Sequence, residues 1–204
     1  KKSKTNRSMN IYSTKSFLNF PCAHAQWFDV EPDGSPGSCA DFHGYDRSFH
    51  FKFGGDVDEH GWMYPFGELK EVKSFLEYYF DHTSLLPAND KRVKDIPTHM
   101  LKPGGILGTL RVLPFGVSME MTSLFVWEHV NNYILRQTSG RVYVAAVEVK
   151  EHERNSGIIE VSKEIALQQL YPTVVEVLPK CRFWEYESPR DALRRLKIIG
   201  LEYV

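Results

Sequence analysis

Aromatic and polar residues alternate along residues 45–53, and this is the clearest pattern in the chain. The aromatic-rich set and the polar set are Tyr45, Arg47, Phe49, Phe51 and Phe53 against Asp46, Ser48, His50 and Lys52. Because successive side chains of a strand point to opposite faces, the alternation predicts a strand with one apolar face, ended by Gly54 and Gly55. Residues 9–26 are rich in aromatic and β-branched side chains, and we expect them to pair antiparallel with that strand.

Two later segments carry the period of a helix. Apolar residues recur at helical spacing within residues 69–80 and again across residues 119–136. The long connection between them is rich in glycine and proline and leaves room for one short strand near residues 106–113. Residues 141–151 predict a buried strand, and residues 156–162 predict a strand that returns beside it. The order of strand, strand, helix, helix, strand, strand indicates an α+β fold.

The chain of 204 residues is long enough for one domain with a sizeable core. We assign that domain to residues 9–162, after a polar and basic leader at residues 1–8. Residues 163–204 predict a C-terminal α/β extension packed on the domain, with a helix, one or two strands and a final capped helix. No internal repeat is visible.

Charge and cysteine content exclude several classes of function. Lys and Arg number 25 against 26 Asp and Glu, so a nucleic-acid partner is not expected. The three cysteines lack the spacing of a structural zinc module or a disulfide framework, which indicates a reducing compartment. The sequence has no apolar run that could span a bilayer and no signal peptide, so we expect a cytoplasmic protein without a membrane partner.

The stretch SCADFHGYDRSFHFKF holds the first candidate chemistry. Cys39 stands four residues before His43, and this spacing resembles a nucleophile beside a metal ligand. Cys22 and His24 lie two residues apart on the preceding predicted strand, so both side chains can share one face. His50 belongs to the face opposite Tyr45, which favours a structural role for it.

Six motifs follow one another between residues 20 and 160 and together suggest a family. In order they are FPCAHAQ, CADFHGYD, GDVDEHGWMYPFGELK, FDHTSLLPAND, SMEMTSLFVWEHV and AAVEVKE. They resemble the F-x-A-A-H strand, the C-x-x-x-H-G-H-N site, the G-x-x-D-x-x-G-M-V-x-D-F-x-x-L-K segment, the L-D-H-x-x-L-N turn, the P-T-S-E helix start and the glutamate-ending strand of the 6-pyruvoyl-tetrahydropterin synthase and 6-carboxytetrahydropterin synthase family.

The resemblance implies a tunnelling fold, or T-fold. In such proteins four antiparallel strands carry two helices on one face, and subunits join edge to edge into a trimeric barrel. Two barrels stack into a homohexamer, a dimer of trimers whose active sites lie between subunits. Closing the barrel across subunits pairs the strand edges that an isolated sheet would expose.

The resemblance also implies a reaction and the residues that perform it. The substrate would be the pterin 7,8-dihydroneopterin triphosphate, and a zinc ion would polarise its side-chain oxygens. Cys39 would be the proton-transfer base, Asp81 and His82 a relay, and His24 and His43 two of the three zinc ligands. Substrate binding would fall to Glu151, which would accept two parallel N–H groups of the pterin, with Glu120 and Ser118 beside it.

Tyr45 departs from the family pattern, because a histidine occupies the third ligand position there. Catalytic zinc ordinarily keeps three protein ligands, and a phenol must lose its proton before it binds tightly. Asp41 or Asp46 could complete a set of two histidines and one carboxylate, with zinc, another metal or no metal bound. Pro65 also replaces a family aspartate, and Val117 and Met119 replace the family residues around Ser118.

Three hypotheses remain open at this point. The first is a lyase of the 6-carboxytetrahydropterin synthase type, in 7-deazaguanine (queuosine-type) biosynthesis. The second is a related enzyme with another pterin or purine-like substrate, and the third is a metal-free binding or assembly protein. Structural roles also remain open for single residues: an inert Cys39, a helix-end His82, a solvated Glu151, a first-turn Glu120 and a core His24. Retention of the thiol and the relay together with Glu151 favours an enzyme.

Overall fold

The computed structural model describes residues 10–100, 103–114 and 116–168. The predicted leader at residues 1–8 and residues 169–204 of the predicted extension lie outside the described residues. The elements are β1 (Tyr12–His24), β2 (Asp46–Gly55), α1 (Lys70–Phe80), β3 (Thr83–Pro87), β4 (Thr109–Leu113), α2 (Met119–Gln137), β5 (Val142–His152), β6 (Asn155–Glu160) and α3 (Lys163–Leu167). Short 3-10 turns occupy parts of the connections, among them Ser38–Ala40.

The strands form one mixed sheet in the order β4-β3-β1-β2-β5-β6. The pairs β1–β2, β2–β5 and β5–β6 are antiparallel, whereas β1–β3 and β3–β4 are parallel. The predicted α+β class is confirmed, and the four predicted antiparallel strands are present as β1, β2, β5 and β6. The prediction of a sheet of only four strands is wrong, because β3 and β4 extend it in parallel to six strands among the described residues. The short strand expected near residues 106–113 is present as β4.

β3 was missed because it gives no alternating signal. Thr83, Leu85, Leu86 and Pro87 are all buried, so this five-residue strand lacks a polar face. A short run with four of its five residues buried has no period of two to detect. β3 pairs with Cys22, Ala23 and His24 at the end of β1, which extends the sheet at that end only.

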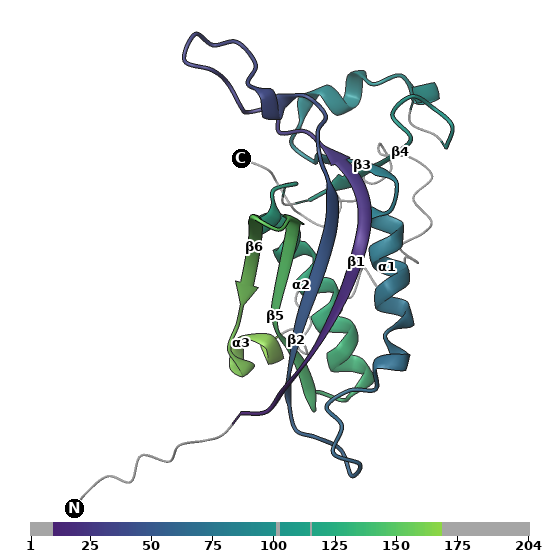
Figure 1. Ribbon diagram of the computed structural model, residues 1–204, viewed down its shortest axis with the longest axis vertical. Coiled ribbons are helices and arrows are strands. Elements are labelled where there is room, and N and C mark those ends of the chain that lie inside the picture. The colour runs from purple at the N-terminus through teal and green to yellow at the C-terminus, as the bar shows by residue number, and fades with distance from the viewer. Residues whose placement is uncertain (1–9, 101–102, 115, 169–204) are drawn as a thin grey trace, which may run out of the picture.

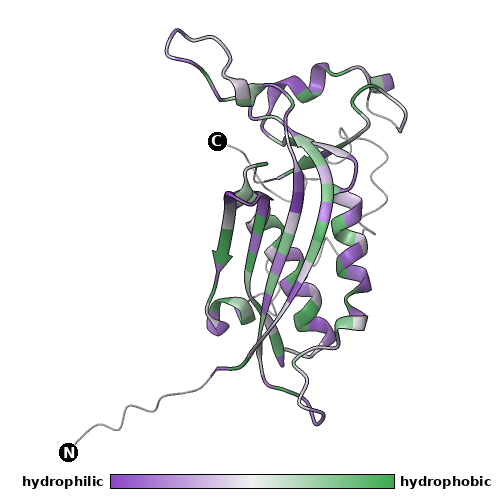
Figure 2. Ribbon diagram, viewed as in Figure 1, coloured by the Kyte–Doolittle hydropathy of each residue, from purple (hydrophilic) through white to green (hydrophobic). Residues whose placement is uncertain are grey.

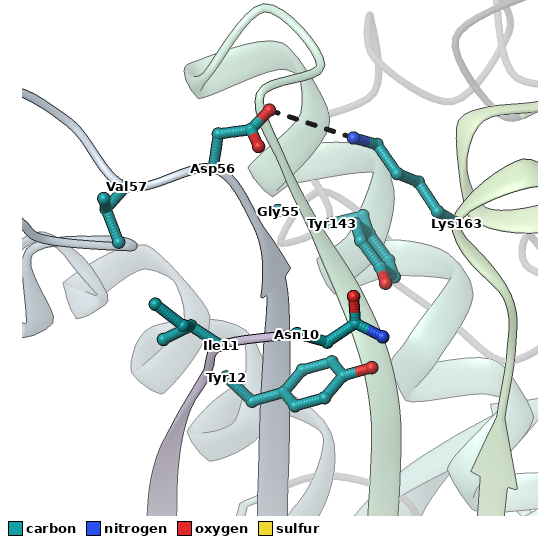
Figure 3. A pocket seen from close by; sticks show the side chains of 8 residues that line it. All are labelled: Asn10, Ile11, Tyr12, Gly55, Asp56, Val57, Tyr143 and Lys163. Atoms are coloured by element: carbon teal, nitrogen blue, oxygen red, sulfur yellow. Dashed lines mark ion pairs between the residues drawn. The ribbon is translucent and has the colours of Figure 1, made fainter. Parts of the chain in front are cut away.

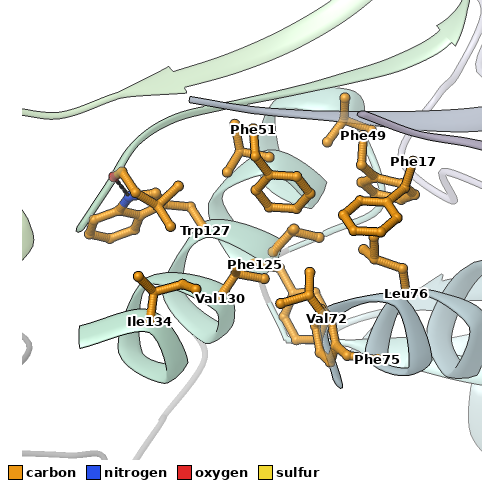
Figure 4. Packing of buried hydrophobic residues seen from close by; sticks show 14 of the residues in the cluster. Phe17, Phe49, Phe51, Val72, Phe75, Leu76, Phe125, Trp127, Val130 and Ile134 are labelled. Atoms are coloured by element: carbon orange, nitrogen blue, oxygen red, sulfur yellow. Dashed lines mark hydrogen bonds between the residues drawn. The ribbon is translucent and has the colours of Figure 1, made fainter. Parts of the chain in front are cut away.

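Both long helices pack on one face of the sheet, and the core lies between the two layers (Figure 1). Figure 4 shows Phe49 and Phe51 of β2 facing Phe125 and Val130 of α2. Phe75 and Leu76 of α1 belong to the same cluster of buried residues. Hydrophilic and hydrophobic residues alternate along the long strands in Figure 2, which is the pattern of a sheet with one covered face.

The covered face of the sheet changes from apolar to polar at one end. β1 continues from buried Phe20 and Cys22 to His24, and β2 begins with Arg47 before Phe49. On β5, Glu151 follows the buried Val149 by two residues. The three strands therefore bring a histidine, an arginine and a glutamate to the same end of the core.

Within the described residues, no helix is both long and apolar enough to cross a membrane.

Candidate functional site

His24 and His43 are held together by their backbones at the end of β1. The His24 N–H donates to the His43 carbonyl at 2.7 Å, and the His43 N–H donates back to the His24 carbonyl at 3.0 Å. Their ring centroids lie 4.4 Å apart. Gly44 permits this approach, since it has φ 155° and a Cβ there would lie 2.4 Å from the Cys22 carbonyl oxygen.

Glu151 reaches the same histidine pair from β5. Its Oε1 lies 3.7 Å from His24 Nε2, and the ligand atoms of His24, His43 and Glu151 all lie within 4.8 Å of one another. His24 is only 2% exposed. Two buried atoms of this cluster, His24 Nδ1 and Glu151 Oε1, have no hydrogen-bond partner among the described residues.

These three side chains fit a divalent metal ion. Imidazole nitrogens and a carboxylate oxygen are ordinary ligands of zinc and iron, and the unpaired buried Glu151 oxygen is a group that a cation would satisfy. His43 Nδ1 lies 2.8 Å from the Asp41 carbonyl, to which it can donate, so that Nε2 keeps its lone pair. The carboxylate of this cluster comes from Glu151, whereas the sequence had suggested Asp41 or Asp46.

Burial keeps His24 in the neutral form that a ligand needs. The pKa of His24 is lowered from 6.5 to about 3, first by burial and then by the positive charge of Arg47 and by His43. Burial likewise raises the pKa of the Cys22 thiol to about 11. Cys22 is therefore a protonated core residue, and Cys39 is the candidate for chemistry.

Cys39 sits in the turn Ser38–Ala40, half-buried beside the end of β1. Its N–H donates to Asp29 Oδ2 at 2.9 Å, and its carbonyl accepts from the Gln26 N–H at 2.7 Å. Gln26 follows His24 by two residues. The loop that carries the cysteine is thus attached to the strand that carries the first histidine.

Asp81 and His82 form the pair that the sequence suggested as a relay. His82 Nδ1 and Asp81 Oδ1 are 2.6 Å apart, and the His82 N–H donates to the Pro21 carbonyl at 2.8 Å. The His82 side chain is 84% exposed. In the described part of the chain, no hydrogen bond or ion pair joins this pair to Cys39.

Ser118 and Glu120 lie at the start of α2 and have local roles there. Ser118 caps the helix, because its Oγ accepts from the Met121 N–H at 3.3 Å. Glu120 is exposed in the first turn, and its backbone touches β6 so closely that a Cβ on Gly157 would lie 2.3 Å from the Glu120 nitrogen.

Tyr45 and His50 make contacts with other parts of the sheet. Tyr45 is 61% exposed and packs edge-on against His152 with 5.4 Å between ring centroids. His50 lies opposite Ser16 on β1, and Ser16 Oγ is 2.8 Å from its Nδ1. His50 is not among the three residues of the described chain whose ligand atoms gather at this site.

Arg47 is the site residue that sequence reasoning overlooked. It is buried, and its guanidinium donates to Thr122 Oγ1 at 2.6 Å and to the Val117 carbonyl at 2.8 Å. The available signal was a cation on the aromatic-rich face of the alternating strand. Such a residue is rarely fully buried unless it has partners.

A hollow lies at the other end of the long strands. This hollow of about 340 Å³ is lined by Tyr12, Asp56, Tyr143 and Lys163 among others, as Figure 3 shows. Lys163 Nζ and Asp56 Oδ2 lie 3.8 Å apart across it. It holds none of the residues considered above.

The fold and the cluster together define an α+β protein with a metal-compatible site at one end of a mixed sheet. Residues 13–162 match the family model described as 6-pyruvoyl tetrahydropterin synthase. The chain belongs to this family of lyases.

Solved structures agree with that fold. An uncharacterised protein from Wolinella succinogenes aligns with a TM-score of 0.62 at 19% identity, covering 76% of this chain and 100% of that one. A 6-pyruvoyl tetrahydropterin synthase from Plasmodium vivax aligns with a TM-score of 0.53 at 18% identity, covering 74% of this chain and 99% of that one. A comparison with curated protein sequences finds no match.

Proposed function

We propose that the protein is a 6-carboxytetrahydropterin synthase-like lyase that acts on 7,8-dihydroneopterin triphosphate in 7-deazaguanine biosynthesis in the cytoplasm. The observation that carries this proposal is the contact of His24 with His43 beside the Cys39 loop, with Glu151 3.7 Å from His24. Three kinds of group that the reaction needs, a metal-ligand pair, a thiol and a carboxylate, are gathered around the end of β1.

The residues divide the chemistry between binding and proton transfer. A zinc ion or another divalent metal held by His24 and His43 would polarise the substrate's side-chain oxygens and stabilise developing negative charge. The Cys39 thiolate would take up and return the proton of the side-chain carbon. Asp81 accepts from His82 Nδ1, which fixes the imidazole tautomer and leaves Nε2 to exchange a proton.

The exposure of the relay supports a site shared between subunits. His82 Nδ1 is bonded to Asp81, but the rest of the His82 side chain is open to solvent. We therefore place the relay at the site of a neighbouring copy, in a homo-oligomer whose assembly pairs the edge strands β4 and β6. A hexamer built as a dimer of trimers is the form that we expect.

The pterin ring would lie on the Glu151 side of the histidine pair. A carboxylate at that place can accept from the donors of the pterin edge or bind the metal. Glu120 is exposed at the start of α2 and is free to contribute from the same or a neighbouring subunit, whereas Ser118 already caps the helix.

One observation favours a second candidate function. Tyr45 stands where the family has its third histidine and is exposed on the surface. A divergent T-fold protein that binds a pterin or purine-like ligand without turnover would tolerate this change. In that case the ligand would bind to wild-type protein and no product would form at any metal loading.

Mass-spectrometric detection of products from 7,8-dihydroneopterin triphosphate tests the proposal. Metal-loaded wild-type protein should release triphosphate and, with one water, cleave the side chain to 6-carboxytetrahydropterin and the two-carbon fragment acetaldehyde. Cys39→Ala should lose turnover and keep substrate binding, while Ser38→Ala, in the same turn, should keep both. Absence of product from the metal-loaded wild-type protein would overturn the proposed reaction.

A further inference from the structure

We infer that Glu151 is the third protein ligand of the metal site, with His24 and His43, in the place that Tyr45 leaves vacant. This inference deepens the proposed function, on which it rests for the presence of a metal. It assigns Glu151 to the metal in preference to the edge of the pterin ring.

The distances suit ligands of a common ion better than a direct hydrogen bond. His24 Nε2 and Glu151 Oε1 are 3.7 Å apart, which exceeds hydrogen-bond distance. Ligands bonded at about 2.1 Å around a tetrahedral metal are about 3.4 Å from each other. The whole set lies within 4.8 Å, so small side-chain rotations bring the three atoms to bonding distance.

The burial of Glu151 also requires a partner. Its side chain is 15% exposed, and the buried Oε1 has no hydrogen-bond partner among the described residues. A buried carboxylate oxygen without a partner costs free energy, and a cation would offset that cost. His43 is already oriented for the same purpose by its contact with the Asp41 carbonyl.

Arg47 does not neutralise Glu151 directly. Its Nη1 and Nη2 donate to Thr122 Oγ1 and the Val117 carbonyl. Among the ion pairs of the described residues, none joins Arg47 to Glu151, and the Glu151 charge only partly offsets the lowering of the Arg47 pKa by burial. The carboxylate thus remains available to a metal ion.

Tyr45 is a poor candidate for the same position. Its side chain is 61% exposed and packs edge-on against His152, with 5.4 Å between the ring centroids. A neutral phenol is a weaker metal ligand than an imidazole nitrogen or a carboxylate oxygen.

The ligand set predicts which metals bind. Two neutral imidazoles and one carboxylate suit Zn²⁺ and also Fe²⁺ or Co²⁺, with positions left open for substrate oxygens. A metal-bound Glu151 oxygen is no longer free to accept from a pterin. Pterin recognition would then depend on other groups.

Calorimetric titration of chelator-treated full-length protein with Zn²⁺ tests the assignment, with Co²⁺ absorption as a report on ligand geometry. Glu151→Gln should weaken Zn²⁺ binding by about 100-fold or more, since even the outer partners of metal ligands are worth about 10–100-fold. Glu148→Gln is the matched control and should bind Zn²⁺ as wild type does, because Glu148 lies on the same strand but its carboxylate is 3.7 Å from Lys150 Nζ and is not part of the three-residue cluster. Tyr45→Phe should leave both Zn²⁺ affinity and the Co²⁺ spectrum unchanged.

The metal-free variants show whether folding accounts for a loss of binding. Glu151→Gln removes an unpaired buried charge, so its thermal unfolding temperature without metal should equal or exceed that of wild type.

The outcomes separate the ligand assignment from the proposed reaction. Unchanged Zn²⁺ affinity in Glu151→Gln, or a loss of Zn²⁺ affinity in Tyr45→Phe alone, would overturn the ligand assignment. If Zn²⁺ binding depends on Glu151 but no product forms, the proposed reaction fails and the ligand assignment stands. If product forms and Glu151→Gln loses only pterin affinity, the ligand assignment fails and the reaction stands.

Discussion

Arg47 Nη1 on β2 donates a hydrogen bond of 2.6 Å to Thr122 Oγ1 in α2. The same guanidinium bonds to the Val117 carbonyl just before the helix. Arg47 therefore fixes the start of α2 against the sheet at the end where His24 and Glu151 lie. Its buried charge also lowers the pKa of His24, after the larger effect of burial.

Replacing Arg47 should reveal both effects. Arg47→Met keeps most of the volume but leaves Thr122 Oγ1 and the Val117 carbonyl without this donor, so we expect a loss of about 3 kcal/mol in unfolding free energy. Urea denaturation of wild type and Arg47→Met measures this difference in unfolding free energy. NMR titration of the metal-free variant should show the pKa of His24 above its present value of about 3. Thr122→Val removes the acceptor of Arg47 Nη1 and a longer bond of 3.5 Å from Thr122 Oγ1 to the Val117 carbonyl, and should cost about 1–3 kcal/mol. Stability equal to wild type in Arg47→Met would refute the structural role.

Gly44 should be sensitive to a single methyl group. A Cβ at this position would lie 2.4 Å from the Cys22 carbonyl oxygen, and φ 155° disfavours other residues. Gly44→Ala should lower the unfolding free energy by about 1–3 kcal/mol and weaken Zn²⁺ binding, because it separates His43 from His24. Gly67→Ala, where an added Cβ meets nothing within 4 Å, is the control. Equal stability of the two variants would show that the backbone near Cys22 yields at little cost.

Buried histidine makes the stability of the metal-free chain depend on pH. His129 packs on Phe75 and Phe125, and burial lowers its pKa from 6.5 to about 4 despite the Phe125 carbonyl, which raises it. The unfolded chain binds a proton near pH 6.5 and the folded chain only near pH 4. Stability from this group is therefore complete above pH 6.5 and falls between pH 6.5 and 4, by about 1.4 kcal/mol per pH unit at most.

Unfolding temperature measured from pH 7.5 to 4.5 checks this expectation. His129→Gln should flatten part of the decline, with His24 responsible for a further part because its pKa is lowered in the same direction. His60→Gln, at an exposed histidine, should reproduce the wild-type curve. A His129→Gln curve parallel to wild type throughout would mean that this imidazole is protonated in the folded state.

Asn131 connects three elements and should tolerate replacement poorly. Its side chain accepts from the Val144 N–H of β5 at 2.8 Å and donates to the Ala166 carbonyl of α3 at 3.0 Å. Asn131→Leu leaves both backbone groups without these partners, so we expect a loss of about 2–3 kcal/mol by chemical denaturation. Asn132→Ala is the neighbouring control. If Asn131→Leu keeps the unfolding free energy of wild type and only the amides of α3 exchange faster, then only the contact with Ala166 depends on this side chain.

The sequence predicted those elements whose residues repeat with a regular period. β2, α1 and α2 have strict alternation or an apolar stripe, and their observed bounds lie within a few residues of the expected ones. β3 was not predicted, because its residues are mostly buried and show no alternation of apolar and polar positions. The polar groups at the end of the core depend on strand register, which brings β5 beside β2 and so brings Glu151 to His24 across more than a hundred residues of sequence.

Local motifs likewise predicted some contacts and missed others. Asp81 and His82 are neighbours in sequence, so their hydrogen bond required no knowledge of the fold. The orientation of Tyr45 depends on the backbone at Gly44 and on His152 of a distant strand, neither of which a motif describes. The family pattern has a metal ligand at the position of Tyr45, whereas the carboxylate beside the histidines comes from β5, which is separated from β1 by β2.

The end of β1 is paired along both of its edges. On one edge Cys22, Ala23 and His24 align with β3, and on the other His24 exchanges two hydrogen bonds with His43. A strand end fixed in this way does not fray, because opening it breaks both ladders at once. The first histidine is thus preorganised before any ligand arrives, and amide protons around it should exchange with solvent as slowly as those in the middle of the sheet.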